Sequence, residues 1–279
     1  MIELRQLFTP VEAIDAEEAQ KYLAEHREGA YTLLDVRQPW EYEKDHIPGA
    51  RLIPLGQLKD SINELDKDKP TLVYCAVGGR SRVAAQLMSG LGFKEVYNLA
   101  GGIKAYRGAK AAGPYELSLD LVRGDETPSE MLALAFGMEK ALQKFYETMA
   151  GKSQDQELTN LLTRLGHIEA AHQRQVFERY QALNPDTKDM AALEAEVNAD
   201  VMEGGYNVKE FLTKNEPYMQ TAPQILEVAM MVETQALDLY LRFASKSREE
   251  ETRETLFAIA EEEKAHLAAL GRLLDEKRS

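Results

Sequence analysis

The chain has 279 residues and a formal net charge of −14, with 33 Lys and Arg residues against 47 Asp and Glu residues and a single Cys. One Cys excludes an internal disulfide framework and a Cys-rich metal site, and the acidic balance argues against a nucleic-acid partner, whose phosphates need a positive surface. The length favours about two domains, and without a run of about 18 apolar residues or a basic, apolar leader we expect a cytoplasmic protein that spans no membrane.

The first part of the chain, residues 1–108, alternates short apolar runs with stretches of helical period. The runs YTLLDV (31–36) and TLVYC (71–75) are typical of buried strands, and AEEAQKYLAEH (16–26) is typical of a helix. Charge is nearly balanced here, with 15 basic and 16 acidic residues in 1–110. The alternation predicts an α/β domain with a mainly parallel sheet.

The single Cys75 ends the second of these apolar runs and opens a tight loop before a predicted helix. Two Gly residues let backbone N–H groups of the loop turn inward, and the N-terminus of the helix adds positive potential. Both effects favour the thiolate, the reactive form of Cys, so we predict that Cys75 is a nucleophile. A buried structural Cys is the alternative. The loop residues that surround the sulfur in this prediction are Ala76, Val77, Gly78, Gly79 and Ser81.

This part of the chain resembles the rhodanese family across about residues 5–108. The matching motifs stand in the family order: Leu34-Asp35-Val36-Arg37 with Glu41, HIPGA (46–50), the Cys75 loop and NLAGG (98–102). The resemblance implies that Cys75 accepts a sulfane sulfur as a persulfide and passes it to a nucleophile. It also implies that Arg80 holds the anionic part of the donor, while Asp35 and Arg37 brace the loop region.

Loop length separates two chemistries. Cys75 and Arg80 form a Cys-x4-Arg pattern, one residue shorter than the Cys-x5-Arg cradle that phosphatases shape around phosphate. The shorter loop favours sulfur transfer over phosphoryl transfer. The loop also lacks the Cys-Gly-Ser/Thr-Gly pattern of mercaptopyruvate enzymes, which leaves thiosulfate, polysulfide and a persulfide such as glutathione persulfide as candidate donors.

The segment 109–127 is a predicted linker. Residues 108–128 contain three Gly and two Pro residues, which is typical of a connection between domains. Within it, ELSLDLV (116–122) alternates like a short strand, so docking of this segment on one domain is the alternative.

Residues 128–279 have a helical period nearly throughout, and 111–279 hold 18 basic and 31 acidic residues. Four long helices are predicted, at about 128–150, 153–182, 222–245 and 248–277. Three pairs have the spacing of a capping box, namely Thr127 with Glu130, Ser153 with Gln156, and Ser247 with Glu250.

The stretch 184–220 is too long for a hairpin loop and contains a predicted helical piece at 189–202. One long crossover between two helix pairs is the connectivity of ferritin-like bundles. We therefore predict an all-α four-helix bundle over 128–279.

The acidic part contains an internal repeat with an offset of 94 residues. Three metal-type residues recur, and the pairs are Glu139 and Glu233, Glu169 and Glu263, and His172 and His266. Tyr146 and Tyr240 recur as well, and at helical spacing we expect them in the core. A single Glu-x-x-His is most often a solvated helix face, but two copies with a Glu 30 residues upstream are hard to attribute to chance.

The repeated residues suit a metal centre. A Glu and a His three residues apart project from one face of a helix, so both can ligate one ion. Four carboxylates buried together need counter-charge, which two divalent cations supply. Oxygen and nitrogen ligands without a thiolate suit iron or manganese, and affinity alone does not exclude zinc.

Residues 128–279 resemble the ferritin-like family and, within it, the rubrerythrin-type dimetal proteins. The resemblance implies that the six repeated residues are ligands of two metal ions, with iron as the first expectation, and that the bundle handles peroxide or oxygen or stores iron. It also implies a homodimer. The four-Cys rubredoxin module of classical rubrerythrins is absent from this sequence, so another protein would have to supply electrons.

Three functional interpretations follow. The first is a sulfurtransferase whose persulfide chemistry is coupled to a dimetal redox site, with a sulfur acceptor or an electron-donor protein as partner. The second is a peroxidase or oxidase in the bundle with an accessory rhodanese domain. The third is a non-enzymatic carrier of metal or persulfide.

Overall fold

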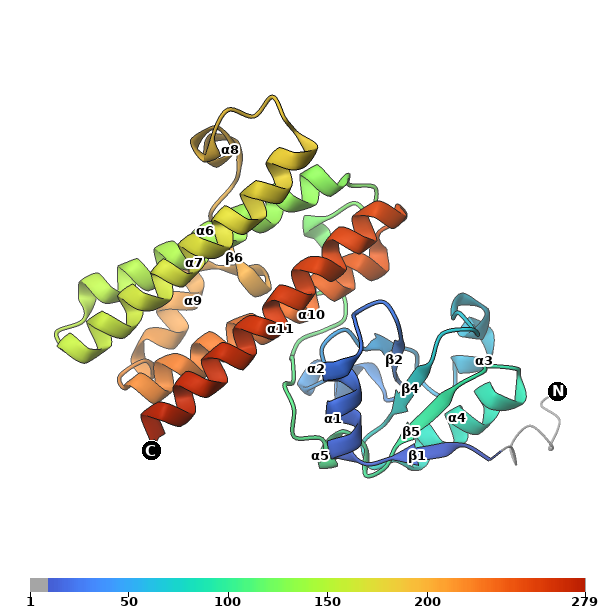
Figure 1. Cartoon of the computed structure of the whole chain (residues 1–279). Coiled ribbons are helices and arrows are strands. Elements are labelled where there is room, and N and C mark those ends of the chain that lie inside the picture. Colours follow the sequence, from blue (N-terminus) through green and yellow to red (C-terminus); the bar gives the residue numbers. More distant parts are fainter. Residues whose placement is uncertain (1–9, 279) are drawn as a thin grey trace. The chain divides into compact units, whose positions relative to one another are not determined.

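The computed structural model describes residues 10–278 of the chain (Figure 1). Residues 1–9, which include the start of the expected first domain, lie outside the described part. The chain divides into two compact units between Leu117 and Ser118. The predicted fold class, an α/β domain followed by a helical bundle, is confirmed.

The first unit is built on a parallel five-stranded sheet with the strand order β1-β5-β4-β2-β3. Its strands are β1 (Glu12–Ile14), β2 (Thr32–Asp35), β3 (Arg51–Leu52), β4 (Thr71–Tyr74) and β5 (Val96–Leu99). Its helices are α1 (Ala16–Glu25), α2 (Pro39–Lys44), α3 (Leu58–Ser61), the 3₁₀ turn η2 (Ile62–Glu64), α4 (Gly79–Gly90) and α5 (Gly102–Ala105).

Strand β4 occupies the centre of this sheet, and all four of its residues are buried. A parallel strand covered on both faces needs apolar side chains on both, which explains the continuous apolar run in the sequence. Asp35 at the end of β2 pairs in register with Tyr74 at the end of β4. The segments that follow these two strands therefore meet at one edge of the sheet, where ligands of open α/β sheets bind.

The second unit contains four long helices, α6 (Pro128–Lys152), α7 (Gln156–Leu183), α10 (Ala222–Lys246) and α11 (Glu250–Arg278). The most extensive helix contacts join α6 to α7 and α10 to α11, so the bundle consists of two helix pairs. Aliphatic and methionine side chains with several aromatic rings fill its interior, and both Tyr146 and Tyr240 are buried in it, as expected of core residues.

The crossover between α7 and α10 comprises α8 (Met190–Glu196), β6 (Val201–Met202), the 3₁₀ turn η4 (Glu203–Gly205), β7 (Tyr206–Asn207), α9 (Val208–Asn215) and the 3₁₀ turn η5 (Glu216–Tyr218). The helical piece expected at 189–202 is wrong beyond Glu196. There the chain forms an antiparallel pair of short strands, β6 and β7. The turn between them uses Gly204 and Gly205, whose φ angles of 74° and 78° are open to glycine at little cost.

Residues 118–127 lie against the helices of the second unit. Leu119–Leu121 is a single 3₁₀ turn, η3, so the strand suggested by alternation is not formed. Lys246 donates from Nζ to the carbonyl of Leu119 at 2.7 Å, and Thr252 donates from Oγ1 to the carbonyl of Glu126 at 2.8 Å. These bonds attach the segment to the end of α10 and the first turn of α11.

The helix starts agree only in part with the predicted capping boxes. Thr127 and Glu130 form the predicted box at α6. At α7 the cap is Asp155, whose side chain accepts from the N–H groups of Glu157 and Leu158, so the prediction of Ser153 is wrong. Helix α11 begins at Glu250, which places Ser247 before the helix start.

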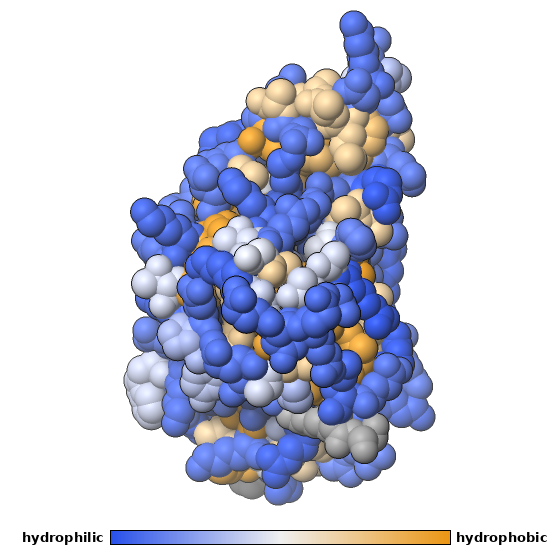
Figure 2. Space-filling model, turned by 90° about the vertical axis from the view of Figure 1, so that its left-hand side faces the viewer, coloured by the Kyte–Doolittle hydropathy of each residue, from blue (hydrophilic) through white to orange (hydrophobic). Residues whose placement is uncertain are grey.

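Within residues 10–278, no helix combines the length and the apolar character needed to cross a membrane. The face shown in Figure 2 is mostly hydrophilic, with its hydrophobic residues in separate patches.

Candidate functional site

Cys75 follows β4 directly and is buried, with 1% of its surface exposed. Helix α4 begins at Gly79, and the residue before it, Gly78, has a φ of 91°. A Cβ atom on Gly78 would lie 3.1 Å from the backbone N of Gly101, so a side chain is disfavoured on both grounds. The loop therefore turns tightly and brings the positive end of α4 toward the sulfur.

Hydrogen-bond donors surround the sulfur of Cys75. The N–H of Gly78 donates to Sγ at 3.2 Å, and Oγ of the buried Ser81 lies 3.5 Å from Sγ. Ser81 is itself held in place, because its Oγ also lies 2.7 Å from Oδ1 of Asn98 on β5, so that its one proton can be directed to either acceptor. The hydroxyl therefore stays next to the sulfur.

These contacts determine the pKa of Cys75. Burial by itself would raise this pKa, but hydrogen bonds from the Ser81 side chain and from the backbone N–H groups of Ser81, Val77 and Gly78 outweigh burial and lower it. A lower pKa means a larger thiolate fraction at neutral pH. The loop thus favours the protonation state that a nucleophile requires.

The turn after β5 supports the loop from behind. The N–H of Ile103 donates to the carbonyl of Cys75 at 2.8 Å, and the N–H of Lys104 donates to the carbonyl of Ala76 at 3.2 Å. At Gly102, where φ is 58°, a Cβ atom would lie 2.2 Å from the carbonyl oxygen of Cys75. The sequence motif at 98–102 therefore has a physical role that its residues alone did not indicate.

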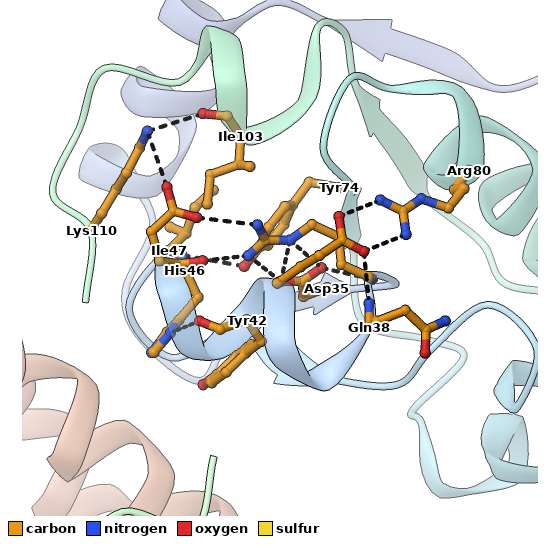
Figure 3. Close-up of polar contacts among 12 residues, drawn as sticks. Asp35, Gln38, Tyr42, His46, Ile47, Tyr74, Arg80, Ile103 and Lys110 are labelled. Atoms are coloured by element: carbon orange, nitrogen blue, oxygen red, sulfur yellow. Dashed lines mark hydrogen bonds and ion pairs between the residues drawn. The ribbon is translucent and has the colours of Figure 1, made fainter. Parts of the chain in front are cut away.

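Arg80 pairs with Glu41 of helix α2 through both ends of its guanidinium group. Nη1 donates to Oε2 and Nη2 donates to Oε1, each at 2.6 Å, and Figure 3 shows Arg80 reaching this carboxylate. The pair raises the pKa of Arg80 and lowers the pKa of Glu41. The role of Glu41 was missed from the sequence. The available signal was its position in the first turn of α2, the helix that follows β2, because β2 pairs with β4 and the two strands end side by side.

Asp35 and Arg37 form a buried ion pair at the end of β2. Nε of Arg37 donates to Oδ2 of Asp35 at 2.9 Å, and Nη2 donates to the carbonyl of Asp45 at 2.5 Å. The guanidinium carbon of Arg37 lies 5.5 Å from the ring centroid of Tyr74, the residue before Cys75. These contacts link the end of β2 to Tyr74 at the end of β4, the strand that leads to the loop.

In the helical unit, the six repeated residues form two groups of three. The first group is Glu139 on α6 with Glu169 and His172 on α7, and the second is Glu233 on α10 with Glu263 and His266 on α11. Within each group, one ligand atom from each residue lies within 4.8 Å of the others. Each helix pair thus contributes one equivalent set.

The two groups meet in the middle of the bundle. In the first group, Nδ1 of His172 lies 2.9 Å from Oε2 of Glu169. In the second, Nδ1 of His266 lies 3.2 Å from Oε2 of Glu263. The rings of His172 and His266 stack with their centroids 3.5 Å apart and their planes 5° apart. The six side chains therefore form one continuous cluster across four helices.

The chemistry of this cluster fits a pair of divalent cations. Oε2 of Glu233 is buried, and the contact of His266 Nδ1 with it is long, at 3.5 Å, although a carboxylate oxygen in a protein interior needs a close partner. Burial raises the pKa of Glu169, and the charge of Glu233 raises it further. Cations between these oxygen and nitrogen atoms would remove both costs.

Comparisons with known proteins agree with the two units. A family model described as a rhodanese-like domain matches residues 15–109, and a model described as rubrerythrin matches residues 130–274. Among curated proteins, "Thiosulfate sulfurtransferase GlpE" of Pseudomonas syringae is 37% identical over 99 residues, covering 36% of this chain and 90% of that protein.

Other relatives match over shorter stretches. "Uncharacterized protein YqhL" of Bacillus subtilis is 51% identical over 76 residues, covering 27% of this chain and 60% of that protein. The chain spans less than two thirds of the length of this protein and of two further curated relatives. A crystal structure of a rhodanese-like domain protein from Staphylococcus aureus is 28% identical, with 35% of this chain and 92% of that chain covered and a TM-score of 0.33.

Proposed function

Because this chain belongs to the rubrerythrin family through its helical unit and to the rhodanese family through its α/β unit, we propose that it transfers sulfane sulfur through Cys75 and also holds a dimetal redox centre. The observation that carries the sulfur-transfer function is the position of the Cys75 sulfur among hydrogen-bond donors of its own loop. Those donors favour the thiolate and can also stabilise a persulfide.

The proposed reaction has two steps. In the first, the Cys75 thiolate attacks the outer sulfur of the donor, a new S–S bond forms, and the old S–S bond breaks with its electron pair leaving on the rest of the donor. The terminal sulfur of the persulfide then carries negative charge, which the inward N–H groups of the loop stabilise. In the second step a nucleophilic acceptor takes that sulfur and restores the thiolate.

The test is the mass of the full chain after incubation with thiosulfate, polysulfide or glutathione persulfide. We expect one added sulfur atom on Cys75, removed by a thiol acceptor and absent in Cys75→Ser. If none of these donors adds sulfur to the wild-type chain, the sulfur-transfer function is wrong.

We propose that the six repeated residues of the bundle hold the two metal ions. Glu139, Glu169 and His172 would bind at one position and Glu233, Glu263 and His266 at the other. Bound iron or manganese would supply electron exchange with peroxide or oxygen, while zinc would serve structure only. In the metal-free chain, burial alone would lower the pKa of His266, but the adjacent Glu233 carboxylate raises it, so His266 can hold a proton between the carboxylates.

A second candidate function is a peroxidase or oxidase in the bundle, with the α/β unit supplying sulfur or electrons. The stacked pair His172 and His266, which joins two equivalent ligand groups into one cluster, favours it. Peroxide consumption that survives in Cys75→Ser but is lost in Glu169→Ala would support this function. Stoichiometric loading of metal or sulfur without turnover would instead support a carrier.

Coupling between the two centres is part of the first proposal. We expect loss of sulfur from the Cys75 persulfide to change rate when peroxide is added to the metal-loaded chain, with Glu169→Ala as the variant that removes the effect. Equal rates with and without peroxide would leave two independent functions on one chain.

A further inference from the structure

We propose that Glu41, on α2, determines the donor specificity of Cys75. It favours sulfane sulfur carried on an organic thiol over the small dianion thiosulfate. Glu41 does so by occupying the guanidinium group of Arg80. The inference rests on the proposed sulfur-transfer function of Cys75.

The contact between Glu41 and Arg80 uses the groups that would otherwise bind an anion. Both terminal nitrogens of Arg80 donate to Glu41, and both carboxylate oxygens accept, each at 2.6 Å. Two parallel bonds of this kind are the strongest arrangement available to an Arg and a carboxylate, and they match the fork that Arg offers to sulfur or phosphorus oxyanions. An incoming oxyanion therefore competes with Glu41 for the same fork.

The pair lies beside the reacting sulfur. The hydrogen bond of Glu41 has the largest effect on the raised pKa of Arg80, and the sulfur of Cys75 contributes in the same direction. From residue 75 to residue 81, Arg80 is the single charged side chain. Arg82 is exposed and stands two positions further along α4, a spacing that does not share a helix face with Arg80. The Arg80 charge next to the loop is therefore balanced by Glu41.

The pairing of Arg80 with Glu41 affects the reactions of the two donors differently, because their leaving groups differ in charge. When the Cys75 thiolate attacks the outer sulfur of thiosulfate, the S–S bond breaks and sulfite leaves with the electron pair and two negative charges. When it attacks an organic persulfide anion, a thiolate leaves with one negative charge. A leaving group with two charges is repelled twice as strongly by the Glu41 carboxylate and gains less from a guanidinium that is already paired.

The surface next to the pair also suits an organic donor. Trp40, which precedes Glu41 on α2, is 69% exposed, and Val77 in the loop itself is 61% exposed. Large exposed apolar side chains of this kind contact organic groups rather than small hydrophilic anions. The part of the donor beyond the sulfur, a peptide or another thiol carrier, has this surface to bind.

The experiment compares Glu41→Gln with the wild-type full chain. The initial rate of sulfur loading on Cys75 is measured by mass spectrometry with thiosulfate and, separately, with glutathione persulfide. Glutamine keeps the size of the side chain and removes its charge, so we expect the ratio of thiosulfate to persulfide rates to rise about tenfold. Sulfite, as a product inhibitor, is expected to bind more tightly to the variant. Glu43→Gln, an exposed carboxylate on the same helix, is the matched control and keeps the wild-type ratio.

The double variant Glu41→Gln with Arg80→Ala removes the expected gain, since the freed guanidinium is what binds the dianion. If Glu41→Gln does not fold, Glu41→Ser removes the same charge and carries the same expectation. An unchanged ratio in a folded Glu41 variant, or a gain that persists without Arg80, overturns the inference. Failure of thiosulfate, polysulfide and glutathione persulfide alike to load the wild-type chain overturns the sulfur-transfer function instead.

Discussion

At the scale of single residues, the sulfur of Cys75 is subject to two opposing effects. Burial favours the neutral thiol, and the surrounding donors favour the thiolate. The donors prevail, since the pKa of Cys75 is lowered overall. Of the donors, the Ser81 side chain has the largest effect, and Asn98 keeps it in position.

We therefore expect Ser81→Ala to raise the pKa of Cys75. A hydrogen bond to a charged group contributes about 1.5 kcal/mol, so the midpoint of the pH dependence of alkylation by iodoacetamide is expected to move up by about one unit. The alkylation rate at neutral pH falls accordingly. Ser89→Ala, near the other end of α4, leaves the midpoint in place. A Ser81→Ala midpoint equal to that of the wild-type chain contradicts the role given to this hydroxyl.

At the scale of elements, the start of α7 shows how a local pattern can point to the wrong residue. Ser153 and Gln156 have capping-box spacing, but Ser153 ends α6 and its Oγ accepts from the N–H of Asp155 at 3.2 Å. Asp155 then accepts from the N–H groups of Glu157 and Leu158 at 2.8 and 3.0 Å. The two helices share a turn too short for both residues to be caps of α7.

We expect Asp155→Ala to lower the free energy of unfolding of the bundle by about 1 kcal/mol, because two N–H groups at the helix start lose their acceptor. Ser153→Ala, two residues away, removes two hydrogen bonds to the backbone of Asp155 in the turn, but it leaves the acceptor of the two helix N–H groups in place and is expected to cost less. Thermal or urea unfolding of the two variants measures the difference. A larger loss of unfolding free energy for Ser153→Ala would indicate that Ser153, and not Asp155, caps α7.

At the scale of the whole molecule, the negative charge is concentrated after residue 110. Of the 31 acidic residues in 111–279, four belong to the buried cluster, so two divalent ions would reduce the net charge of that part from −13 to −9. Charges held in the interior destabilise the fold unless they are paired, whereas surface charges are solvated. Metal binding is therefore expected to contribute to the stability of the bundle.

We expect Mn²⁺ in excess to raise the melting temperature of the full chain, with each site contributing about 2.7 kcal/mol at a hundredfold excess over its Kd. Glu139→Gln removes a ligand and reduces the gain, while Glu147→Gln changes an exposed carboxylate of the same helix and does not. An equal gain in melting temperature in both variants would show that the stabilisation does not come from metal bound at the buried cluster.

The same gain is expected to grow between pH 5 and pH 7. The pKa of Glu169 is raised in the folded chain, so without metal its contribution to stability is present at low pH and is lost as the pH rises through the folded pKa. A metal needs the deprotonated carboxylate and competes with the proton at low pH. Melting temperatures with and without Mn²⁺ at the two pH values test this, and a gain that is larger at pH 5 contradicts it.

The fold class could be predicted from the sequence because it depends on local periodicity. The first part of the chain alternates apolar runs with helical stretches, and the second part has a continuous helical period. Both patterns are visible along the chain itself. The six metal-type residues could be selected for the same reason, since an offset of 94 residues is a property of spacing. Local pattern also had limits, because α8 ends at Glu196 and residues 201–202, which the predicted helical piece at 189–202 included, form strand β6 instead.

Which side chains meet was decided by the tertiary structure. Glu41 and Arg80 are 39 residues apart in the chain and come together because β2 and β4 are neighbours whose ends are in register. Asn98 reaches Ser81 because β5 lies on the other side of β4. The sequence by itself determined the elements and the reactive residue types. The order of strands in the sheet determined the partners of those residues, because pairing between strands is a long-range property that no local spacing contains.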